Sequence, residues 1–412
     1  MIAFESFDLD NGLKVLVHED HSSPMAVVNL LYKVGARDEQ PEKTGFAHLF
    51  EHLMFGGSKN VPAFDEPLQF VGGDNNAFTS NDITNYYITI PSANLETAFW
   101  LESDRMLSLS FDPKVLEVQR SVVIEEFKQR YLNQPYGDVW LKLRPLAYRE
   151  HSYKWPTIGE KLAHIEEATL DDVKKFFYHY YIPNNAVLVV AGDVTLDQIK
   201  ALSEKWFEPI PAGKIIERNI PKEPVQTSYR LLEVEEDVPT DALYMTFHMA
   251  GRNDDSYYAE DLLSDILGRG KSSRLYQELV DKQAIFNSLS AYVMGSIDPG
   301  LLVIQGKLNE NFDLATAENA IWELIEDFKQ KGIDQDELQK VKNKAESTIV
   351  FSDMELLNRA MNLAYAEMLG DANLVNTELA KMGAVQKTDV MDAAERILHR
   401  SNASVLRYKA KR

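Results

Sequence analysis

The chain has 412 residues, of which 45% are hydrophobic and 26% are charged, and it contains no cysteine. This composition is typical of a globular protein with about two domains of roughly 200 residues each, and it excludes disulfides and thiolate chemistry. The formal net charge of −21 opposes binding to nucleic acid or to an anionic membrane.

The beginning of the chain predicts two strands joined by a polar loop. Residues 14–18 follow an Asn-Gly turn signal, and residues 26–34 form a longer apolar run. The loop between them contains His18 and His21, which could in principle hold a metal ion. Because no third ligand is placed for such a site, a hairpin loop containing Pro24 is the better interpretation.

A helix with two distinct faces is predicted from about Thr44 to the Gly-Gly pair at residues 56–57. An apolar stripe with i, i+3, i+4, i+7 spacing is expected to face the core: Phe46, Leu49, Phe50 and Leu53. A second stripe carries His48, Glu51 and His52. Two imidazoles and a carboxylate on one helix face are what a catalytic zinc site with a general base requires. The order His-x-x-Glu-His is the reverse of the commoner His-Glu-x-x-His.

The rest of the first half alternates strands and helices after a polar, turn-rich stretch at residues 72–82. In chain order, the expected elements are a strand at 84–90, helices at 95–109 and 113–131, a buried strand at 186–193 and a helix at 195–207. A stretch rich in proline, at residues 209–224, follows and is the best linker candidate in the chain.

After this linker the pattern begins again. The expected elements are a strand at 242–249, helices at 257–267 and 273–282, and a strand at 301–307. The final stretch, residues 401–408, loosely resembles residues 184–190. These features predict a weak internal duplication of two α+β halves, with one domain at 1–212, a linker at 213–224 and a second domain at 225–412.

Two histidines are too few for a catalytic zinc ion, which usually has three protein ligands and a water. The third ligand should be a carboxylate on another element, and the adjacent Glu125 and Glu126 on the predicted helix at 113–131 are the richest candidates. Apolar residues occupy several faces of that helix, so periodicity does not choose between them. Two exposed surface glutamates are the ordinary alternative.

Several motifs together resemble the pitrilysin/insulysin-like family of inverted-zincin metallopeptidases, which includes mitochondrial processing peptidase. The segments that carry the resemblance run through the chain: 48–52, 76–80, 84–86, 120–126 and 181–185. The resemblance implies one Zn²⁺ per chain, held by His48, His52 and Glu126, with Glu51 as the general base. The implied activity is that of a zinc endopeptidase acting on short or unfolded peptides.

The resemblance also implies a fold and a substrate-binding strand. The expected fold is α+β, with two homologous domains, each an antiparallel-rich sheet packed with helices, that form half of a clam-shell chamber. Asn76, Ala77, Phe78 and Thr79 would belong to an edge strand that pairs with the backbone of the substrate. An ordinary sheet edge is the alternative.

The chain departs from the family pattern at three positions. Gln119 stands where the family usually has a glutamate that supports the metal site from the same helix as Glu126. In the second half, Val280 and Asn287 stand where catalytic members carry an Arg and a Tyr that stabilise the oxyanion of the tetrahedral intermediate. A valine and an asparagine cannot do that work.

These departures lead to a hypothesis about partners. The chain would supply zinc, and a homologous subunit would supply the Arg/Tyr pair; a homodimer is the rival assembly. A non-catalytic subunit that binds peptides or organises a complex is the alternative function. The first residues lack an export signal and no apolar run approaches ~18 residues, so we expect a cytoplasmic protein as the sequence stands, or a periplasmic one if an export signal was removed.

Overall fold

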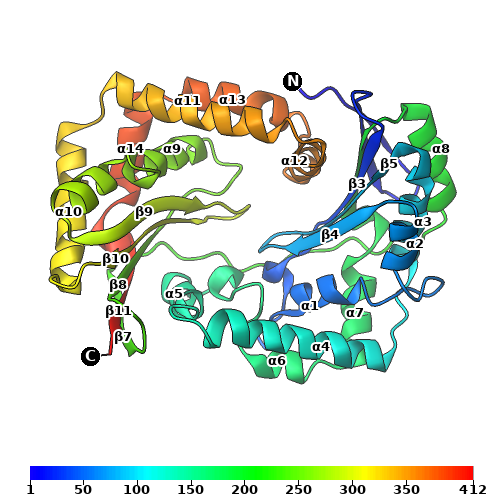
Figure 1. Cartoon of the computed structure of the whole chain (residues 1–412), viewed down its shortest axis with the longest axis horizontal. Helices are drawn as coiled ribbons and strands as arrows, with labels where there is room; N and C mark the ends of the chain where they lie inside the picture. Colours follow the sequence, from blue (N-terminus) through cyan, green and yellow to red (C-terminus); the bar gives the residue numbers. More distant parts are fainter. Residues whose placement is uncertain (412) are drawn as a thin grey trace. The chain divides into compact units, whose positions relative to one another are not determined.

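The computed structural model describes residues 1–411, which divide into two compact units (Figure 1). The first unit contains Met1–Gln129, Trp155–Pro221 and Val350–Thr377. The second contains Arg130–Lys154, Lys222–Ile349 and the described chain from Glu378 onward. Each unit is therefore built from segments that are far apart in the sequence.

The first unit has a six-stranded sheet in the order β1-β2-β6-β3-β5-β4. Its strands are β1 (Glu5–Asp8), β2 (Lys14–Glu19), β3 (Met25–Tyr32), β4 (Asp74–Thr79), β5 (Thr84–Pro91) and β6 (Ala186–Gly192). Only β2 and β6 pair in parallel, and all other neighbours are antiparallel. The strand β4 lies at the edge, where its outer backbone groups have no strand partner.

The second unit has a five-stranded sheet in the order β7-β11-β8-β10-β9. Its strands are β7 (Arg230–Glu236), β8 (Ala242–His248), β9 (Phe286–Met294), β10 (Leu301–Leu308) and β11 (Ala403–Ala410). Again one pair, β7 with β11, is parallel and the rest are antiparallel. The order matches that of β2-β6-β3-β5-β4, so the two sheets have the same topology apart from β1.

Helices cover both faces of the first sheet. The unit contains α1 (Phe46–Leu53), α2 (Asp65–Phe70), α3 (Leu95–Leu107), α4 (Pro113–Phe127), α6 (Leu162–Glu166), α7 (Leu170–Tyr180), α8 (Leu196–Trp206) and α12 (Leu356–Met368). Figure 1 shows α3 and α8 on one face of the sheet and α12 on the other. Alternate residues of the central strands are buried under each layer.

The second sheet is also covered on two sides. Its unit contains α5 (Val139–Ala147), α9 (Tyr257–Gly268), α10 (Leu314–Lys331) and α14 (Lys387–Ile397), while α11 (Gln335–Ser352) and α13 (Leu374–Ala384) each include a border between the residues of the two units. The face that buries Met245 and Phe247 packs against α9 and α10. The opposite face, which buries Tyr244, packs against α5.

Short 3-10 and π turns complete the structure. The 3-10 turns are η1 (Ala36–Asp38), η2 (Ser92–Asn94), η4 (Ser152–Lys154), η5 (Pro183–Asn185) and η7 (Arg400–Asn402), and the π turns are η3 (Lys128–Leu132) and η6 (Tyr276–Lys282). The helices predicted at 113–131 and 273–282 therefore both contain π-helical backbone. The motif helix α1 is shorter than its predicted span.

The duplication predicted from the end of the chain has a structural counterpart. The amide of Asn185 donates to the carbonyl oxygens of Tyr180 and Lys33 at 2.8 and 3.3 Å. The amide of Asn402 donates in the same way to Ile397 and His248, both at 3.0 Å. In each unit this asparagine connects the turn before the strand to the end of the neighbouring strand, so the expectation of two similar α+β domains, each with an antiparallel-rich sheet, is confirmed.

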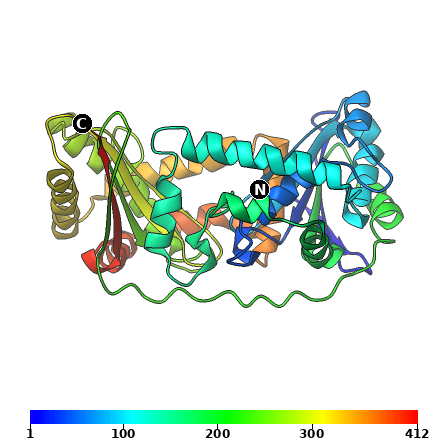
Figure 2. The ribbon, with the colours of Figure 1, turned by 90° about the horizontal axis from the view of Figure 1, so that it is seen from below.

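The sequence-based division at residues 213–224 stays a prediction. Residues 211–227 contain no helix or strand, and Figure 2 shows this segment as an extended trace. The compact units are not contiguous halves, however. The helix α12 follows the linker in sequence and packs on β3 and β6 of the first unit, whereas α5 precedes the linker and packs on β11 of the second.

Candidate metal centre

The helix α1 carries His48, Glu51 and His52 and begins at a position that suits glycine. Gly45 precedes it with φ of 86°, in the left-handed region that favours glycine. Gly45 has no side chain to cap the helix, and the carboxylate of Glu39 takes this role instead. It accepts hydrogen bonds from the backbone N–H groups of Gly45 and Ala47, both at 2.8 Å. The apolar stripe of α1 is buried as predicted: Phe46, Leu49, Phe50 and Leu53.

Glu126 comes from α4, which packs against α1. Its Oε2 atom lies 3.6 Å from His48 Nε2 and 3.4 Å from His52 Nε2. The neighbouring Glu125 points away, with a side chain that is 61% exposed and paired with Lys128 at 2.7 Å. The structure thus brings Glu126, and not Glu125, to the two histidines.

The geometry of these three side chains suits one divalent cation. One donor atom from each of His48, His52 and Glu126 can be chosen so that the three atoms lie within 4.8 Å of one another. Among residues 1–411, this is the one group of three or more His, Asp or Glu side chains that lie close enough together to share a metal ion. Tetrahedral zinc with bonds near 2.0–2.1 Å separates neighbouring ligand atoms by about 3.4 Å, close to the distances from Glu126. Two imidazoles and a carboxylate are also a donor set that zinc uses in catalytic sites.

Glu51 lies between the two histidines in sequence and has a defined neighbour. The hydroxyl of Thr79, at the end of β4, donates a hydrogen bond of 2.5 Å to its Oε2 atom. The site therefore joins three elements, namely α1, α4 and the edge strand β4.

Comparisons with known proteins identify the family of the chain. Residues 14–160 match the model for "Insulinase (Peptidase family M16)", and residues 167–345 match "Peptidase M16 inactive domain". The zinc protease PqqE of Helicobacter pylori is 36% identical over 346 residues, which cover 82% of this chain and 77% of that protein.

The chain belongs to peptidase family M16. A crystal structure of a protease from Helicobacter pylori, 31% identical, superposes with a TM-score of 0.92 and covers 99% of this chain and all of that one. The periplasmic protease PqqL of Escherichia coli shares the fold at 19% identity with a TM-score of 0.80, and the match covers 98% of this chain but 47% of PqqL. The resemblance inferred from the motifs is thus confirmed.

The helix α3 of this M16 member carries a buried ion pair that was not predicted from the sequence. Arg105 and Glu102 on α3 are 1% and 0% exposed and form two hydrogen bonds. The guanidinium also lies over the rings of Phe64 and Tyr86, each at 4.4 Å from the ring centroid. Oppositely charged residues spaced i, i+3 on a helix usually lie at the surface. The apolar residues around Glu102 and Arg105 in the sequence were the one signal that this pair is buried.

The predicted substrate-binding residues all lie on the edge strand β4. Asn76 and Phe78 are exposed, whereas Ala77 and Thr79 are half-buried. Because side chains alternate along a strand, Ala77 shares with Thr79 the face directed toward α1. The strand therefore offers an open edge next to Glu51, and its role in binding substrate stays a prediction.

The remaining predicted positions lie outside the metal cluster. Gln119 is half-buried on α4, the helix of Glu126. In the second unit, Val280 packs against the core from η6, and Asn287 is exposed at the start of β9.

The expected hairpin around His18 and His21 is wrong, because β6 lies between β2 and β3 in the sheet and pairs with both. His18 lies within β2, His21 follows it, and both have ordinary structural partners. His18 Nδ1 lies 2.7 Å from the carbonyl oxygen of Ala3, and His21 Nδ1 lies 2.7 Å from Asp193 Oδ1. The alternative of a second metal site at these residues receives no support.

Within residues 1–411, none of the helices combines the length and the apolar character that a membrane span requires.

Proposed function

We propose that this chain is a zinc-dependent endopeptidase of the inverted His-x-x-Glu-His type that cleaves short or unfolded peptides. The observation that carries the proposal is the approach of Glu126 to both histidines of α1, with Glu51 on the same helix. Relatives named as zinc proteases support the same chemistry.

His48, His52 and Glu126 would hold the ion. When bound, the ion would supply an acidified water molecule and would polarise the scissile carbonyl. Glu51 would take a proton from the attacking water and pass it to the leaving amine. The edge of β4, through the backbone of residues 76–79, would pair with an extended peptide, which gives affinity with little side-chain selectivity.

We further propose that the chain works with a homologous subunit. Val280 and Asn287 occupy the positions where the family resemblance implies an Arg and a Tyr, so this chain would provide zinc and its partner the oxyanion stabilisation. PqqL supports the idea that two such halves cooperate, because this chain matches about half of it and a structure of its "first half" also matches. A homodimer is the rival assembly.

A non-catalytic, peptide-binding or assembly subunit is the second candidate function. Val280 and Asn287 favour this function, and so does the match of residues 167–345 to the family's inactive domain. The compartment is either the cytoplasm, as the sequence stands, or the periplasm, if an export signal was removed. The description of PqqL as a periplasmic protease favours the periplasm.

Metal analysis with a matched pair of variants tests the zinc site. Glu126→Gln should lose most of the bound zinc measured by mass spectrometry, whereas Glu125→Gln should keep it, because Glu125 points away on the same helix. Equal zinc in both variants would contradict the assignment of Glu126 as a ligand.

Peptide hydrolysis separates the enzymatic from the non-catalytic function. Glu51→Gln should retain zinc and lose about 10²–10⁴-fold in kcat, measured with an internally quenched peptide and with or without a homologous protein that carries the Arg/Tyr pair. Unimpaired turnover by Glu51→Gln would remove Glu51 as the base. Full activity of the isolated chain would exclude an obligatory partner.

A further inference from the structure

The side chain of Thr79 is directed at the proposed base. On β4 the exposed and half-buried residues alternate, and Thr79 lies on the half-buried face, where its hydroxyl donates to Glu51 Oε2 at 2.5 Å. A residue that only contacted substrate would be expected on the exposed face, with Asn76 and Phe78. The resemblance placed Thr79 among the substrate-binding residues, and its orientation suggests a different task.

The end of β4 is held firmly at this point. The turn that follows Thr79 closes with a hydrogen bond from Ser80 N–H to the carbonyl oxygen of Ile83 at 2.8 Å. The carbonyl oxygens of Ser80 and Asn81 accept hydrogen bonds from the N–H groups of Ala36 and Arg37 at 3.1 and 2.9 Å. The turn is therefore tied to η1 through its backbone.

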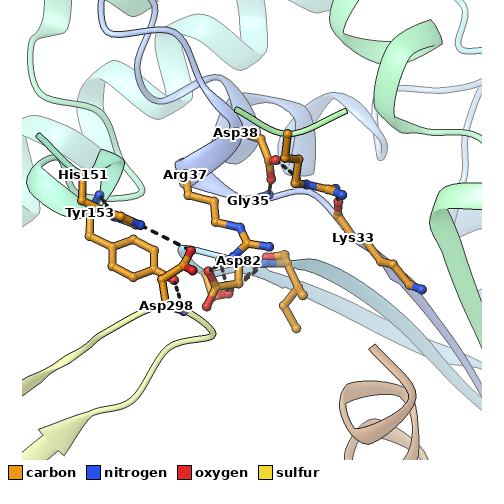
Figure 3. A network of polar contacts seen from close by, with 11 residues as sticks. Lys33, Gly35, Arg37, Asp38, Asp82, His151, Tyr153 and Asp298 are labelled. Carbon is orange, nitrogen blue, oxygen red and sulfur yellow. Dashed lines mark hydrogen bonds and ion pairs between the residues drawn. The ribbon is translucent and has the colours of Figure 1, made fainter. Parts of the chain in front are cut away.

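A largely buried ion pair strengthens this connection. The Arg37 guanidinium lies 3.4 Å from Asp82, with side chains that are 10% and 6% exposed. Figure 3 shows the two side chains pointing toward each other, beside the turn in which Gly35 N–H donates to Asp38 at 3.0 Å. A buried ion pair is stable only where its geometry compensates the loss of hydration. The Arg37–Asp82 pair therefore helps to fix the turn between β4 and β5 relative to η1.

The same short segment also fixes the helix that carries Glu51. Glu39 follows η1 directly and caps α1 through the N–H groups of Gly45 and Ala47. Residues 35–39 thus hold both the strand end that presents the Thr79 hydroxyl and the helix that presents the Glu51 carboxylate. The hydrogen bond between them joins two anchored groups, which makes it an effective constraint.

We propose that Thr79 is a positioning residue for Glu51, an inference that rests on the proposed function. Its hydroxyl stops the rotation of the carboxylate and aims it at the water that Glu51 must deprotonate. A hydrogen bond to a charged group is stronger than one between neutral groups, so this single donor can set the orientation of the carboxylate. Because Thr79 is also the last paired residue of the edge strand, substrate pairing along β4 and the orientation of the base involve the same residue.

Two substitutions at Thr79 separate the hydroxyl from the shape of the side chain. Thr79→Val keeps the branched shape and removes the donor, whereas Thr79→Ser keeps the donor. In whichever assembly the wild type is active, we expect Thr79→Val to lower kcat about 10- to 100-fold with KM within about twofold and zinc content unchanged. We expect Thr79→Ser to recover most of kcat. Thr89→Val, at a half-buried threonine near the other end of the β4–β5 pair, is the matched control.

The kinetic pattern can overturn the inference. A raised KM with unchanged kcat in Thr79→Val would assign Thr79 to substrate binding only, and a Thr79→Ser variant as slow as Thr79→Val would show that the hydroxyl does not act. Wild-type kinetics for Thr79→Val beside an inactive Glu51→Gln would overturn the inference and leave the proposed function standing.

The interaction can also be measured without turnover. A double-mutant cycle of Thr79→Val and Glu51→Ala, with stability measured by denaturant unfolding, should give a coupling free energy clearly different from zero. Strict additivity of the two substitutions would contradict the proposed hydrogen bond whether or not the chain is an active peptidase.

Discussion

Glu39 holds the first turn of α1, so its replacement tests how far the histidine-bearing helix depends on a residue outside it. In Glu39→Ala, the buried N–H groups of Gly45 and Ala47 lose the oxygens that accept them at 2.8 Å. Each buried donor left unpaired costs about 1–3 kcal/mol. Burial raises the pKa of Glu39 well above its ordinary value, so removal of the carboxylate offsets part of this cost. We expect a net loss of about 2–4 kcal/mol.

Thermal unfolding followed by circular dichroism measures this loss. A unit of this size changes its Tm by about 2–4 °C for each kcal/mol, so the transition of the first unit should fall by on the order of 10 °C. Glu39→Gln should be intermediate, because its amide keeps one acceptor and places an NH₂ group against the other N–H. Thr195→Ala removes a single exposed cap of α8 and is the control, with an expected cost of about 1 kcal/mol.

Zinc affinity gives a second, independent measurement on the same variants. Because His48 lies in the first turn that Glu39 caps, Glu39→Ala should weaken zinc on the order of tenfold in competition with a chelator. Thr195→Ala should leave zinc affinity unchanged, since α8 carries no ligand. A Glu39→Ala variant with the Tm and zinc affinity of the wild type would refute the reasoning.

Three further substitutions test the packing and charge of the units. Leu363→Ala removes a fully buried side chain of α12 and should lower the free energy of unfolding, measured with denaturant, by about 2–5 kcal/mol. An unchanged free energy of unfolding would contradict the burial of Leu363 in the core of the first unit. Glu102→Gln leaves the Arg105 guanidinium buried without its carboxylate and should lower the free energy of unfolding by about 3–5 kcal/mol. A negligible change in that free energy would show that the pair does not form. Burial raises the pKa of Asp261 from 3.8 to about 6. Between these values the folded state holds a proton that the unfolded chain has lost, so stability falls as pH rises through this window, and Asp261→Asn should flatten that slope.

The candidate metal centre illustrates what residue spacing can and cannot predict. The spacing of His48, Glu51 and His52 on one helix face depends only on helical geometry, so it was readable from the sequence. The choice of Glu126 over Glu125 depends on how α4 packs against α1, and periodicity left it open because apolar residues lie on several faces of α4. There the family resemblance supplied what the pattern did not.

Glu39 was missed for a different physical reason. The usual cap of a helix is the residue immediately before it, and here that residue is a glycine with no side chain. The acceptor comes from a non-helical segment six positions earlier, where the chain folds back after η1. A glutamate in such a segment has the appearance of a surface residue, because only the tertiary path of the chain brings it to the N–H groups of Gly45 and Ala47.

The helices α5 and α12 show why linear boundaries do not define the compact units. An apolar stripe indicates that a helix must cover a sheet, but it does not identify the sheet. In α12, Leu363 and Ala364 are buried in the first unit with Val27 and Val187, and Arg359 joins Asp20 at 2.7 Å. Residues beyond the linker therefore complete the core of the first sheet.

The same argument applies to α5 in the opposite direction. Val139 and Leu143, which precede the linker, are buried with Leu406 and Tyr408 in the second unit. A chain cut at residue 212 would leave the α12 face of the first sheet open to water and would carry α5 without the sheet that buries it. Each unit thus requires chain from both sides of the linker. The candidate metal centre on α1 and α4 belongs to a unit that is completed only when residues 350–377 have been added.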